Sequence, residues 1–398
     1  MSEKSSVDAE PLVRSKVTRL LASHPPSQAA ERNFLAAQFD SGLAFVHFPA
    51  NLGGLGIPRK FQAIVSEQLV RFGAPIAEGR NPIGYGMAAP TLATKGSPDQ
   101  CRRYLRPLFT CEEIWCQLFS EPGAGSDVAS LSTQAVRDGD EWVINGQKVW
   151  SSLAHLARFG MLLARTDPTA EKHKGLTYFV VDMQSPGVEV RPLRQMTGNA
   201  EFSEVYFTDV RIPDAERLGE VGDGWNGAIV TLMNERVFIG NRVTPRGADA
   251  ISRALDLWKS RPKSDRGPVR RGRLTQLWVE SEVTRLTTMR AAENASLGVP
   301  GPEGSIIKLA SAELNKRIYE FCEDLLGPQG MLSGSWDSEP PVPADESFFQ
   351  WMFLRSPARS IEGGTSEVMR NILGERILSL PSDVRSDKSV PWSETLRS

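Results

Sequence analysis

The chain has 398 residues, which predicts two or three packed units rather than one core. Hydrophobic residues make up 40% of it and charged residues 24%, a balance that is typical of globular proteins and argues against long disordered stretches. With 46 basic and 48 acidic residues the formal net charge is -2, which argues against a protein that binds nucleic acid or an anionic membrane surface.

The N-terminal residues are polar and mixed in charge, and no window offers the roughly 18 uninterrupted apolar residues of a membrane-spanning helix. We therefore expect a cytoplasmic protein that neither crosses nor binds a membrane. The four cysteines are irregularly spaced and the chain has only four histidines, so we expect reduced thiols and no metal site.

The first part of the chain, residues 1–112, is predicted to be a helical domain. Between Pro11 and Phe109 the apolar residues recur mostly at spacings of three and four, as in helices that bury one face. A glycine-rich stretch at 53–56 lacks the Gly-Lys-Ser/Thr that ends a phosphate-binding loop, so we interpret it as a helix connector.

The middle of the chain, residues 113–225, is predicted to be a small β domain, because short β-rich segments are separated there by Asp-Gly, Asn-Gly and Pro-Gly turns. The helical period returns near Gly224, which predicts a C-terminal helical bundle over 226–382. Residues 383–398, rich in Ser, Asp and Lys, are predicted to be a tail. The expected fold class is therefore α+β.

The stretch from Cys116 to Ser152 is the candidate for ligand binding. Its centre, Ser120–Asp127, reads SEPGAGSD, in which small and turn-forming residues let the backbone approach a ligand and offer N–H groups to it. A strand-like run then leads into Trp150–Ser152. An aromatic plate beside two hydroxyls suits a flat heteroaromatic ring that forms hydrogen bonds.

Six short motifs stand along about residues 45–380: FP with GGLG at 48–56, EPGAGSD at 121–127, NGQKVW at 145–150, DVRIP at 209–213, GDGW at 222–225 and EGGTSE at 362–367. Their order, within helical, β and helical parts, resembles the acyl-CoA dehydrogenase family of flavoenzymes. Six motifs in the same order make chance similarity a poor explanation. The resemblance implies an N-terminal α-helical domain, a middle β-barrel or sandwich domain and a C-terminal four-helix bundle.

The resemblance also implies an activity, the FAD-dependent oxidation of an acyl-CoA to the trans-2-enoyl-CoA in fatty acid metabolism and β-oxidation. A base would remove a proton from the carbon next to the thioester carbonyl, and the flavin N5 would accept a hydride from the following carbon. The electrons would then pass to an electron-transferring flavoprotein.

The cofactor contacts implied by the resemblance lie mostly in the β domain. Ser120 would bind the pyrimidine edge of the flavin, Ser152 would donate near N5, and Trp150 would lie against the ring face. Ser126 would lie between the cofactor phosphates and the CoA arm, and so would contact the substrate as well. The expected FAD-binding residues are Gln117, Phe119, Ser120, Gly125, Ser126, Trp150, Ser152, Gly364, Thr365 and Glu367.

The catalytic base is expected to be Glu235. Many family members carry the base as the Glu of a Tyr-Glu-Gly-Thr sequence, but here Gly363 falls at that position and Glu362 stands one residue early. A slip of one residue in an ordered loop turns the side chain elsewhere, so Glu362 is not expected to reach the substrate. Isovaleryl- and long-chain-type members take the carboxylate from a helix, and Met233–Arg236 matches their Leu/Met-x-Glu-Arg.

A lone Glu before an Arg on a helix is more often a surface pair. The loop has Gly363 where many family members have the base, and the helix has Glu235 where other members have it. These two differences together favour the catalytic interpretation, because one carboxylate would replace the other. Gly363 would leave room beside the acyl group and offer its N–H to the thioester oxygen, together with the flavin ribityl hydroxyl. Arg236 points away from Glu235 on a helix, so it is expected to contact CoA or the surrounding structure.

Two positions depart from the family's pattern, and both concern the adenosine diphosphate half of FAD. The usual Arg-x-x-Phe-Gly is not recognisable in 260–273, which holds several other arginines, and Asp324 stands where the family has Gln. A homotetramer or homodimer is expected, since most soluble oligomers are homomeric. A heteromer with a related chain stays open, because some bacterial members divide the site between two polypeptides.

Two other functions also stay open. A flavin oxidase or monooxygenase on the same fold would use the same residue types. A non-catalytic subunit or DNA-binding relative would depend on the basic run Arg261–Arg273, and the net charge of -2 argues against it. The length and shape of the acyl group are not determined by the sequence, although a helical base with a loop glycine favours branched, long or bulky chains.

Overall fold

The computed structural model describes residues 9–240, 246–296, 303–332, 341, 347–382, 387 and 389–395. The chain divides into two compact units. The first unit comprises residues 1–192, 202–234 and 387–398, and the second unit comprises residues 193–201 and 235–386. The chain thus passes from one unit to the other four times.

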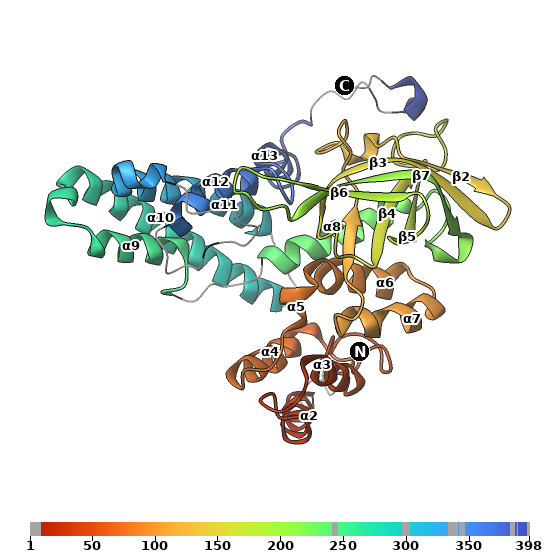
Figure 1. The fold of residues 1–398 in the computed structure, drawn as a ribbon, viewed down its shortest axis with the longest axis horizontal. Coiled ribbons are helices and arrows are strands. Elements are labelled where there is room, and N and C mark those ends of the chain that lie inside the picture. The colour runs from red at the N-terminus through yellow and green to blue at the C-terminus, as the bar shows by residue number, and fades with distance from the viewer. Residues whose placement is uncertain are drawn as a thin grey trace. The chain divides into compact units, whose positions relative to one another are not determined.

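The N-terminal part of the first unit is a group of helices (Figure 1). The first of them buries Val13, Val17 and Leu20, whose spacings of four and three residues are those of one helix face. The last begins with a capping box, in which Ser97 and Gln100 each accept the other's backbone N–H through a side-chain oxygen. The helices are α2 Ala9–Ser23, α3 Glu31–Asp40, α4 Gln62–Arg71, α5 Ala77–Arg80, α6 Ala89–Lys95 and α7 Pro98–Phe109.

An eight-stranded sheet forms the middle of the first unit. Its strand order is β6-β7-β3-β2-β4-β5-β8, and β1 pairs with β4 in parallel. The strands are β1 Trp115–Leu118, β2 Gln134–Asp138, β3 Glu141–Ser152, β4 Phe159–Arg165, β5 Leu176–Asp182, β6 Val188–Leu193, β7 Phe202–Pro213 and β8 Arg217–Leu218.

Both faces of this sheet are buried. One face forms a core of its own, in which Leu162 and Phe179 pack with Phe207. On the opposite face, residues such as Met161 pack with apolar side chains of α6 and α7, including Leu105. Because both faces are covered, β4 is buried at every position.

A short segment near the C-terminal end of the chain returns to the first unit. Trp392 is only 3% exposed, and its backbone N–H donates to the Ala170 carbonyl at 2.9 Å. Pro391 forms an isolated β-bridge with Glu171. Residues 387 and 389–395 lie in the stretch that the sequence suggests is a tail, and they pack on the β domain.

The helix α8, Gly224–Gly240, begins in the first unit and ends in the second. Its Thr231 is buried in the first unit, where its hydroxyl lies 2.8 Å from the Thr91 hydroxyl and 3.0 Å from that of Tyr178. The further helices of the second unit are α9 Ala250–Ser260, α10 Pro268–Ser296, α11 Glu303–Leu326, α12 Ser347–Arg355 and α13 Ser366–Ile372.

Within the second unit, α11 packs against α9, α10 and α12, which lie alongside it in Figure 1. Their shared core includes Leu257 from α9, Leu277 from α10 and Ile318 from α11. The excursion at 193–201 joins this unit through Asn199, whose side-chain oxygen accepts the Trp351 indole N–H at 2.5 Å. The order of helical, β and helical parts predicted from the sequence is confirmed.

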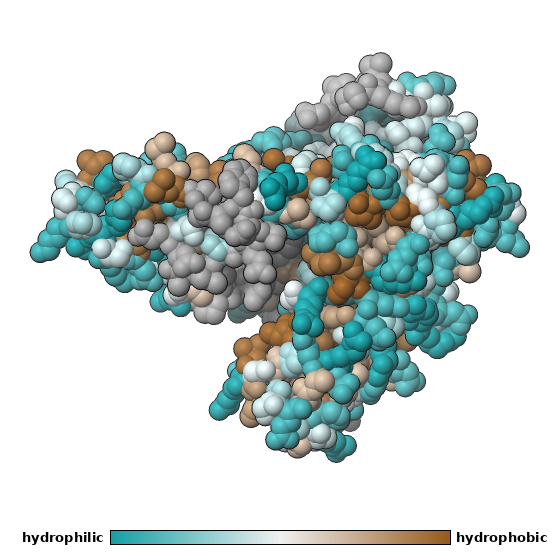
Figure 2. Space-filling view, in the orientation of Figure 1, coloured by the Kyte–Doolittle hydropathy of each residue, from teal (hydrophilic) through white to brown (hydrophobic). Residues whose placement is uncertain are grey.

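The surface is mixed in polarity. On the face drawn in Figure 2 hydrophilic residues cover most of the area and interrupt smaller apolar areas. Several apolar side chains of α10 are exposed, among them Val283 and Leu286. Within the described ranges, no helix combines the length and apolarity needed to cross a membrane.

Candidate active site

The SEPGAGSD loop leaves the sheet directly after β1. Glu121 and Ala124 exchange two backbone hydrogen bonds of 3.0 Å, which close a tight turn around Pro122 and Gly123. The following residues, 125–127, are exposed, and the chain is buried again from Val128. The loop therefore presents three consecutive residues to its surroundings.

A buried ion pair attaches this loop to β3. The Lys148 ammonium, whose side chain is fully buried, donates to the Glu121 carboxylate and to the Phe119 carbonyl, both at 2.9 Å. The Glu121 carboxylate also accepts the backbone N–H groups of Ser132 at 2.6 Å and Thr133 at 2.8 Å. One carboxylate thus connects the start of the loop, its end and the neighbouring strand.

The protonation of this pair follows from its surroundings. Burial would raise the pKa of Glu121, but the Lys148 charge and the hydrogen bonds from Thr133, Lys148 and Ser132 outweigh it and hold the pKa below its usual value. Burial pulls the pKa of Lys148 down, against the attraction of Glu121. The loop is therefore anchored by a carboxylate that stays ionised.

Trp150 stands at a β-bulge next to this loop. Lys148 pairs with Val205 and Ser151 with Ser203, so three steps along β3 oppose two along β7. Trp150 is the extra residue, with a positive φ of 60°, and its side chain is 59% exposed. The bulge turns the indole outward into an accessible position.

The Trp150 segment and the loop lie side by side. The Val149 N–H donates to the Ser120 carbonyl at 2.9 Å, which joins the start of SEPGAGSD to the bulge. Gln117, Ser120 and Ser152 are all partly exposed, whereas Phe119 is buried in the core and holds the backbone between them. The first unit therefore brings together the flavin-contacting residues predicted from its sequence.

Two local features fit a bound cofactor. Gly125 lacks a left-handed φ, and an added Cβ there would meet nothing within 4 Å, so neither backbone conformation nor packing in the chain requires glycine. A ligand that approaches the backbone closely would require it. The Ser151 hydroxyl, in a side chain 1% exposed, has no hydrogen-bond partner within the described ranges.

The far end of the loop is held by the C-terminal segment. Asp127 forms an ion pair of 2.9 Å with Lys172, which also pairs with Asp387. The Trp392 indole N–H donates to the Ser130 carbonyl at 3.3 Å, and its ring lies 4.5 Å from the buried Arg165 guanidinium. Asp127 and Ser130, the loop residues in these contacts, lie within four residues of Ser126.

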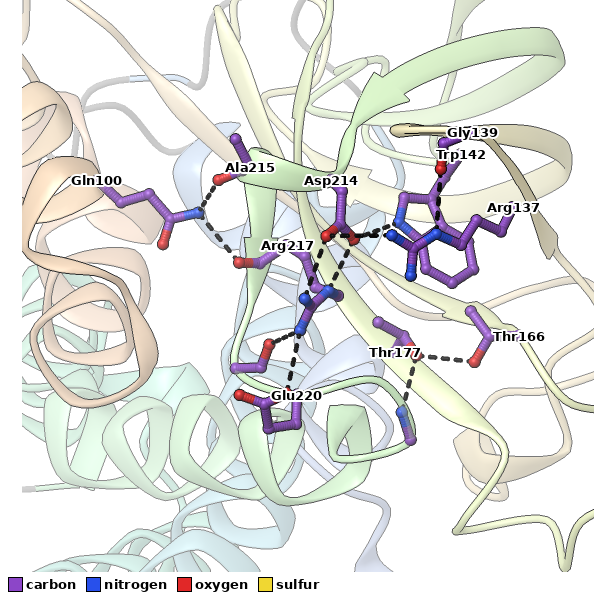
Figure 3. Close-up of polar contacts among 12 residues, drawn as sticks. Gln100, Arg137, Gly139, Trp142, Thr166, Thr177, Asp214, Ala215, Arg217 and Glu220 are labelled. Atoms are coloured by element: carbon purple, nitrogen blue, oxygen red, sulfur yellow. Dashed lines mark hydrogen bonds and ion pairs between the residues drawn. The ribbon is translucent and has the colours of Figure 1, made fainter.

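Figure 3 shows a second polar network, at the exit of the β domain. The Asp214 carboxylate accepts the Trp142 indole N–H at 2.8 Å and the Arg217 guanidinium at 2.9 Å. These hydrogen bonds lower the pKa of Asp214 to about 2. The Gln100 amide donates to the carbonyls of Ala215 and Arg217, so α7 is attached to this exit.

A pocket of about 600 Å³ lies beside this network. It is lined by charged and polar side chains from both sides of the exit, including Lys95, Arg103 and Glu216. None of the residues predicted to bind FAD lines it. The pocket is therefore distinct from the cofactor contacts predicted from the sequence.

The other predicted site residues belong to the second unit. Glu235 is half-buried on α8. Burial lowers the pKa of Lys308 on α11, and the carboxylates of Glu362, Glu313, Glu235 and Glu367 oppose that effect. The helical carboxylate predicted as the base therefore lies within electrostatic reach of Lys308. The side chain of Arg236, predicted to contact CoA, lies outside the described part of the chain.

The loop that bears Gly363 is held by its charged neighbours. Gly363 and Gly364 have φ of 65° and 97°, a conformation that favours glycine. Glu362 is turned into an ion pair with Arg355, with contacts of 2.9 and 3.3 Å. The Thr365 hydroxyl accepts the Val368 N–H and caps α13, and Glu367 pairs with Arg370 at the surface.

The arginine-rich stretch 261–273 is engaged within the second unit. Arg273 pairs with Asp324 and, at 3.0 Å, with Glu320. Arg270 donates to the Asp324 carbonyl at 3.1 Å, and Arg261 donates to the Gln329 side chain. The two places where the sequence departs from the family's FAD contacts are thus bonded to each other.

Sequence reasoning missed the residues that hold these loops, namely Glu121, Lys148, Arg165, Lys308, Glu313, Arg355 and Trp392. One signal could have found Lys148. It shares the inward face of β3 with Trp142 and Ile144 at even spacing, and a lysine on a buried face needs a carboxylate partner.

Comparison with known proteins identifies the family. Three family models match the chain: "Acyl-CoA dehydrogenase, N-terminal domain" over residues 9–112, "middle domain" over 116–210 and "C-terminal domain" over 222–378. The chain belongs to the acyl-CoA dehydrogenase family. It is an acyl-CoA dehydrogenase in class, an oxidoreductase of a flavoprotein family whose members use FAD.

Two of the relatives from Mycobacterium tuberculosis (strain ATCC 25618 / H37Rv) illustrate the similarity. The chain is 37% identical to "Acyl-CoA dehydrogenase IpdE1" over 349 residues, which cover 87% of this chain and 86% of that protein. It is 38% identical to "Acyl-CoA dehydrogenase FadE34" over 343 residues, or 86% of this chain and 45% of that longer protein.

Solved structures share the fold. The ChsE4–ChsE5 complex from Mycobacterium tuberculosis is 26% identical with a TM-score of 0.68, and the match covers 96% of this chain and 100% of that one. The Tcur3481–Tcur3483 steroid ACAD is 23% identical with a TM-score of 0.71 and the same coverage.

Proposed function

We propose that this protein catalyses the FAD-dependent α,β-dehydrogenation of an acyl-CoA to the trans-2-enoyl-CoA. The observation that supports this most directly is the Gly363–Gly364 loop of the second unit, which holds left-handed φ values and turns its Glu362 onto Arg355, while α8 supplies a half-buried carboxylate, Glu235. The family's chemistry needs a carboxylate and a carbonyl-binding backbone N–H to act on adjacent atoms of one substrate.

The residues of the first unit would hold the flavin end of the cofactor. Trp150 would cover one face of the ring from its bulge, while Gln117, Ser120 and Ser152 supply polar contacts along its edge. Gly125 and Ser126 would face the phosphates and the CoA arm. Bound FAD would supply the hydride acceptor for the reaction.

Glu235 would remove the proton from the carbon next to the thioester carbonyl. The ion pair between Glu362 and Arg355 supports this choice, because it turns the loop glutamate toward another partner. The Gly363 N–H would hold the thioester oxygen as negative charge develops on it. We propose an electron-transferring flavoprotein as the acceptor of the electrons.

Purification and anaerobic titration with acyl-CoA test the proposed function. The protein, with a partner chain if it has one, should be yellow with FAD, and a suitable acyl-CoA should bleach it in the absence of oxygen. A panel of short, branched, long and ring-bearing acyl-CoAs would define the substrate class. Reduced protein that reoxidises rapidly in air would indicate an oxidase instead.

Glu235→Gln tests the base. This variant should keep FAD and bind acyl-CoA, yet bleach at least about 100-fold more slowly, because a general base contributes roughly 10²–10⁴-fold. Glu362→Gln is the comparison variant and should stay within about tenfold of the wild-type rate. The reverse ranking of the two rates would assign the base to Glu362.

We further propose that the chain works beside a second, related chain. The engagement of Arg270 and Arg273 with Asp324 supports this, because groups bonded to each other are less available to a neighbour's cofactor. The two-component name of the ChsE4–ChsE5 complex, and a relative twice as long, FadE34, are consistent with it.

A further inference from the structure

The glycine loop of the second unit is contacted by two charged side chains of α11. Lys308 donates to the Arg359 carbonyl at 2.8 Å and to the Gly364 carbonyl at 2.5 Å. Five residues on, Glu313 accepts the hydroxyl protons of Ser360 at 3.2 Å and Ser366 at 2.6 Å. The helix α11 therefore binds both ends of the segment 359–366.

The two anchors act on different parts of the loop. Glu313 binds side chains, and its pKa is lowered to about 2 by hydrogen bonds from Lys316, Ser366 and Ser360. Lys308 binds the backbone itself, on either side of Gly363. An ammonium that binds two carbonyls five residues apart restrains the distance between them, and so limits the orientations open to the peptide groups in between.

The two glycines of the loop need an external restraint such as the Lys308 hydrogen bonds. Gly363 and Gly364 stand at φ of 65° and 97°, and glycine visits positive and negative φ about equally when nothing selects between them. The Thr365 cap fixes the chain that follows, and the Glu362–Arg355 pair fixes the residue before. Lys308 is the described side chain that binds the carbonyl of Gly364 itself.

Lys308 also brings positive charge to this place. It is half-buried, and the carboxylates that act on it come from α8 (Glu235), α11 (Glu313), the glycine loop (Glu362) and α13 (Glu367). The Lys308 ammonium therefore places a positive charge beside the glycine loop, among carboxylates from four segments of the second unit.

We propose that Lys308 is a positioning residue for the dehydrogenation, which orients the Gly363 N–H by holding the Arg359 and Gly364 carbonyls on either side of it. This inference rests on the roles proposed above for Glu235 and Gly363. Lys308 would touch neither the substrate nor the flavin, so its effect should appear in the limiting rate of reduction rather than in acyl-CoA affinity or cofactor content.

The test compares three variants of the full-length protein in anaerobic flavin reduction by an acyl-CoA that reduces the wild type. Lys308→Met removes the charge and the donors at similar length, Lys308→Arg keeps the charge on a wider planar group, and Lys259→Met, at an exposed position on α9, is the matched control. FAD content, acyl-CoA affinity and the limiting rate of reduction are measured for each, with the partner chain present if the protein has one.

Lys308→Met should keep its FAD and its acyl-CoA affinity and reduce about 10- to 100-fold more slowly at saturating acyl-CoA. Lys308→Arg should lose only several-fold, and Lys259→Met should match the wild type. Reduction of Lys308→Met at the wild-type limiting rate would overturn the inference alone.

If Lys308→Met does not fold, Lys308→Arg decides, because a wild-type rate in that variant would contradict a role that depends on the ammonium geometry. A wild type that no acyl-CoA of the panel reduces would overturn the proposed function as well. The two failures are therefore distinguishable from the wild-type titration.

Discussion

At the scale of single residues, the buried pair of Glu121 and Lys148 is the feature on which the cofactor loop depends. We expect Lys148→Met to lower the free energy of unfolding by roughly 3–5 kcal/mol, because it leaves the Glu121 carboxylate buried without its cation. Urea unfolding checks this, with Lys259→Met as an exposed control. Recovery in the double variant Glu121→Gln/Lys148→Met would confirm that the lone charge is the cause, whereas a wild-type midpoint for Lys148→Met would contradict it.

Glu323 on α11 predicts a dependence of stability on pH. Burial, with a smaller contribution from the Asp324 carboxylate, raises the pKa of Glu323 to about 7, and one of its oxygens is buried with no hydrogen bond in the described ranges. Since the folded pKa lies above the ordinary value of 4.5, the stability that Glu323 contributes is full below that value and is lost as pH rises through 7.

Glu323→Gln should therefore raise the free energy of unfolding by roughly 1–3 kcal/mol at pH 8 and by little near pH 4. Denaturant midpoints at the two pH values measure this, with Glu320→Gln on the exposed side of α11 as the control. An equal effect at both pH values would mean that ionisation of Glu323 is not the cause.

Residues that carry a motif could be predicted from the sequence, and residues that hold a motif in place could not. SEPGAGSD and Trp-Ser-Ser are each a continuous run of residues, so each motif can be recognised from the sequence alone. The partner of Glu121 lies 27 residues away on β3, at a distance set by strand register. Lys308 and Gly364 are separated by 56 residues and meet only because α11 packs beside the loop.

At the scale of elements, the C-terminal segment supports the cofactor loop. We expect Trp392→Ala to lower the free energy of unfolding by roughly 3–5 kcal/mol, as large-to-small changes in a core do, and to weaken FAD binding. Thermal unfolding and FAD retention on gel filtration measure the two effects. Trp278→Ala, at a half-exposed position on α10, is the control for losing an indole. Unchanged FAD retention in Trp392→Ala would contradict the prediction that the C-terminal segment supports the cofactor loop.

The type of each long element followed from its hydrophobic period, since helices such as α2 and α11 bury one face along several turns. The docking of residues 389–395 did not follow in the same way. Their composition is that of a solvated tail, and the packing depends on one indole whose partners, Arg165 and Ser130, lie more than 220 residues earlier. The bulge at Trp150 is likewise invisible locally, because it exists only in the pairing with β7.

At the scale of the whole molecule, the proposed second chain predicts how the cofactor is held. The chain purified alone should contain clearly less than one FAD per polypeptide, and coexpression with the related chain should restore the content per active site. Sedimentation with absorbance in the protein and flavin bands measures both quantities. A homomeric assembly with one FAD per chain would contradict the proposal while leaving the dehydrogenase function intact.

The family and the order of its three parts could be predicted because six motifs are spread along most of the chain. The oligomeric assembly could not be predicted, because the sequence of one chain does not show which surface of another chain it contacts. The arginines of 261–273 illustrate this, since they could serve a neighbour's cofactor or bond within the chain, and the structure bonds Arg270 and Arg273 to Asp324.

The four passages of the chain between the two units have a consequence for proteolysis. A single cut at any one connection leaves each unit joined to the other through the remaining crossings, so nicked protein should migrate as one species until denatured. Because residues 193–201 and 387–398 each belong to the unit that their neighbours in the chain do not, neither unit can be expressed as one uninterrupted fragment. Dissection of this enzyme would therefore need internal deletions closed by linkers rather than a truncation.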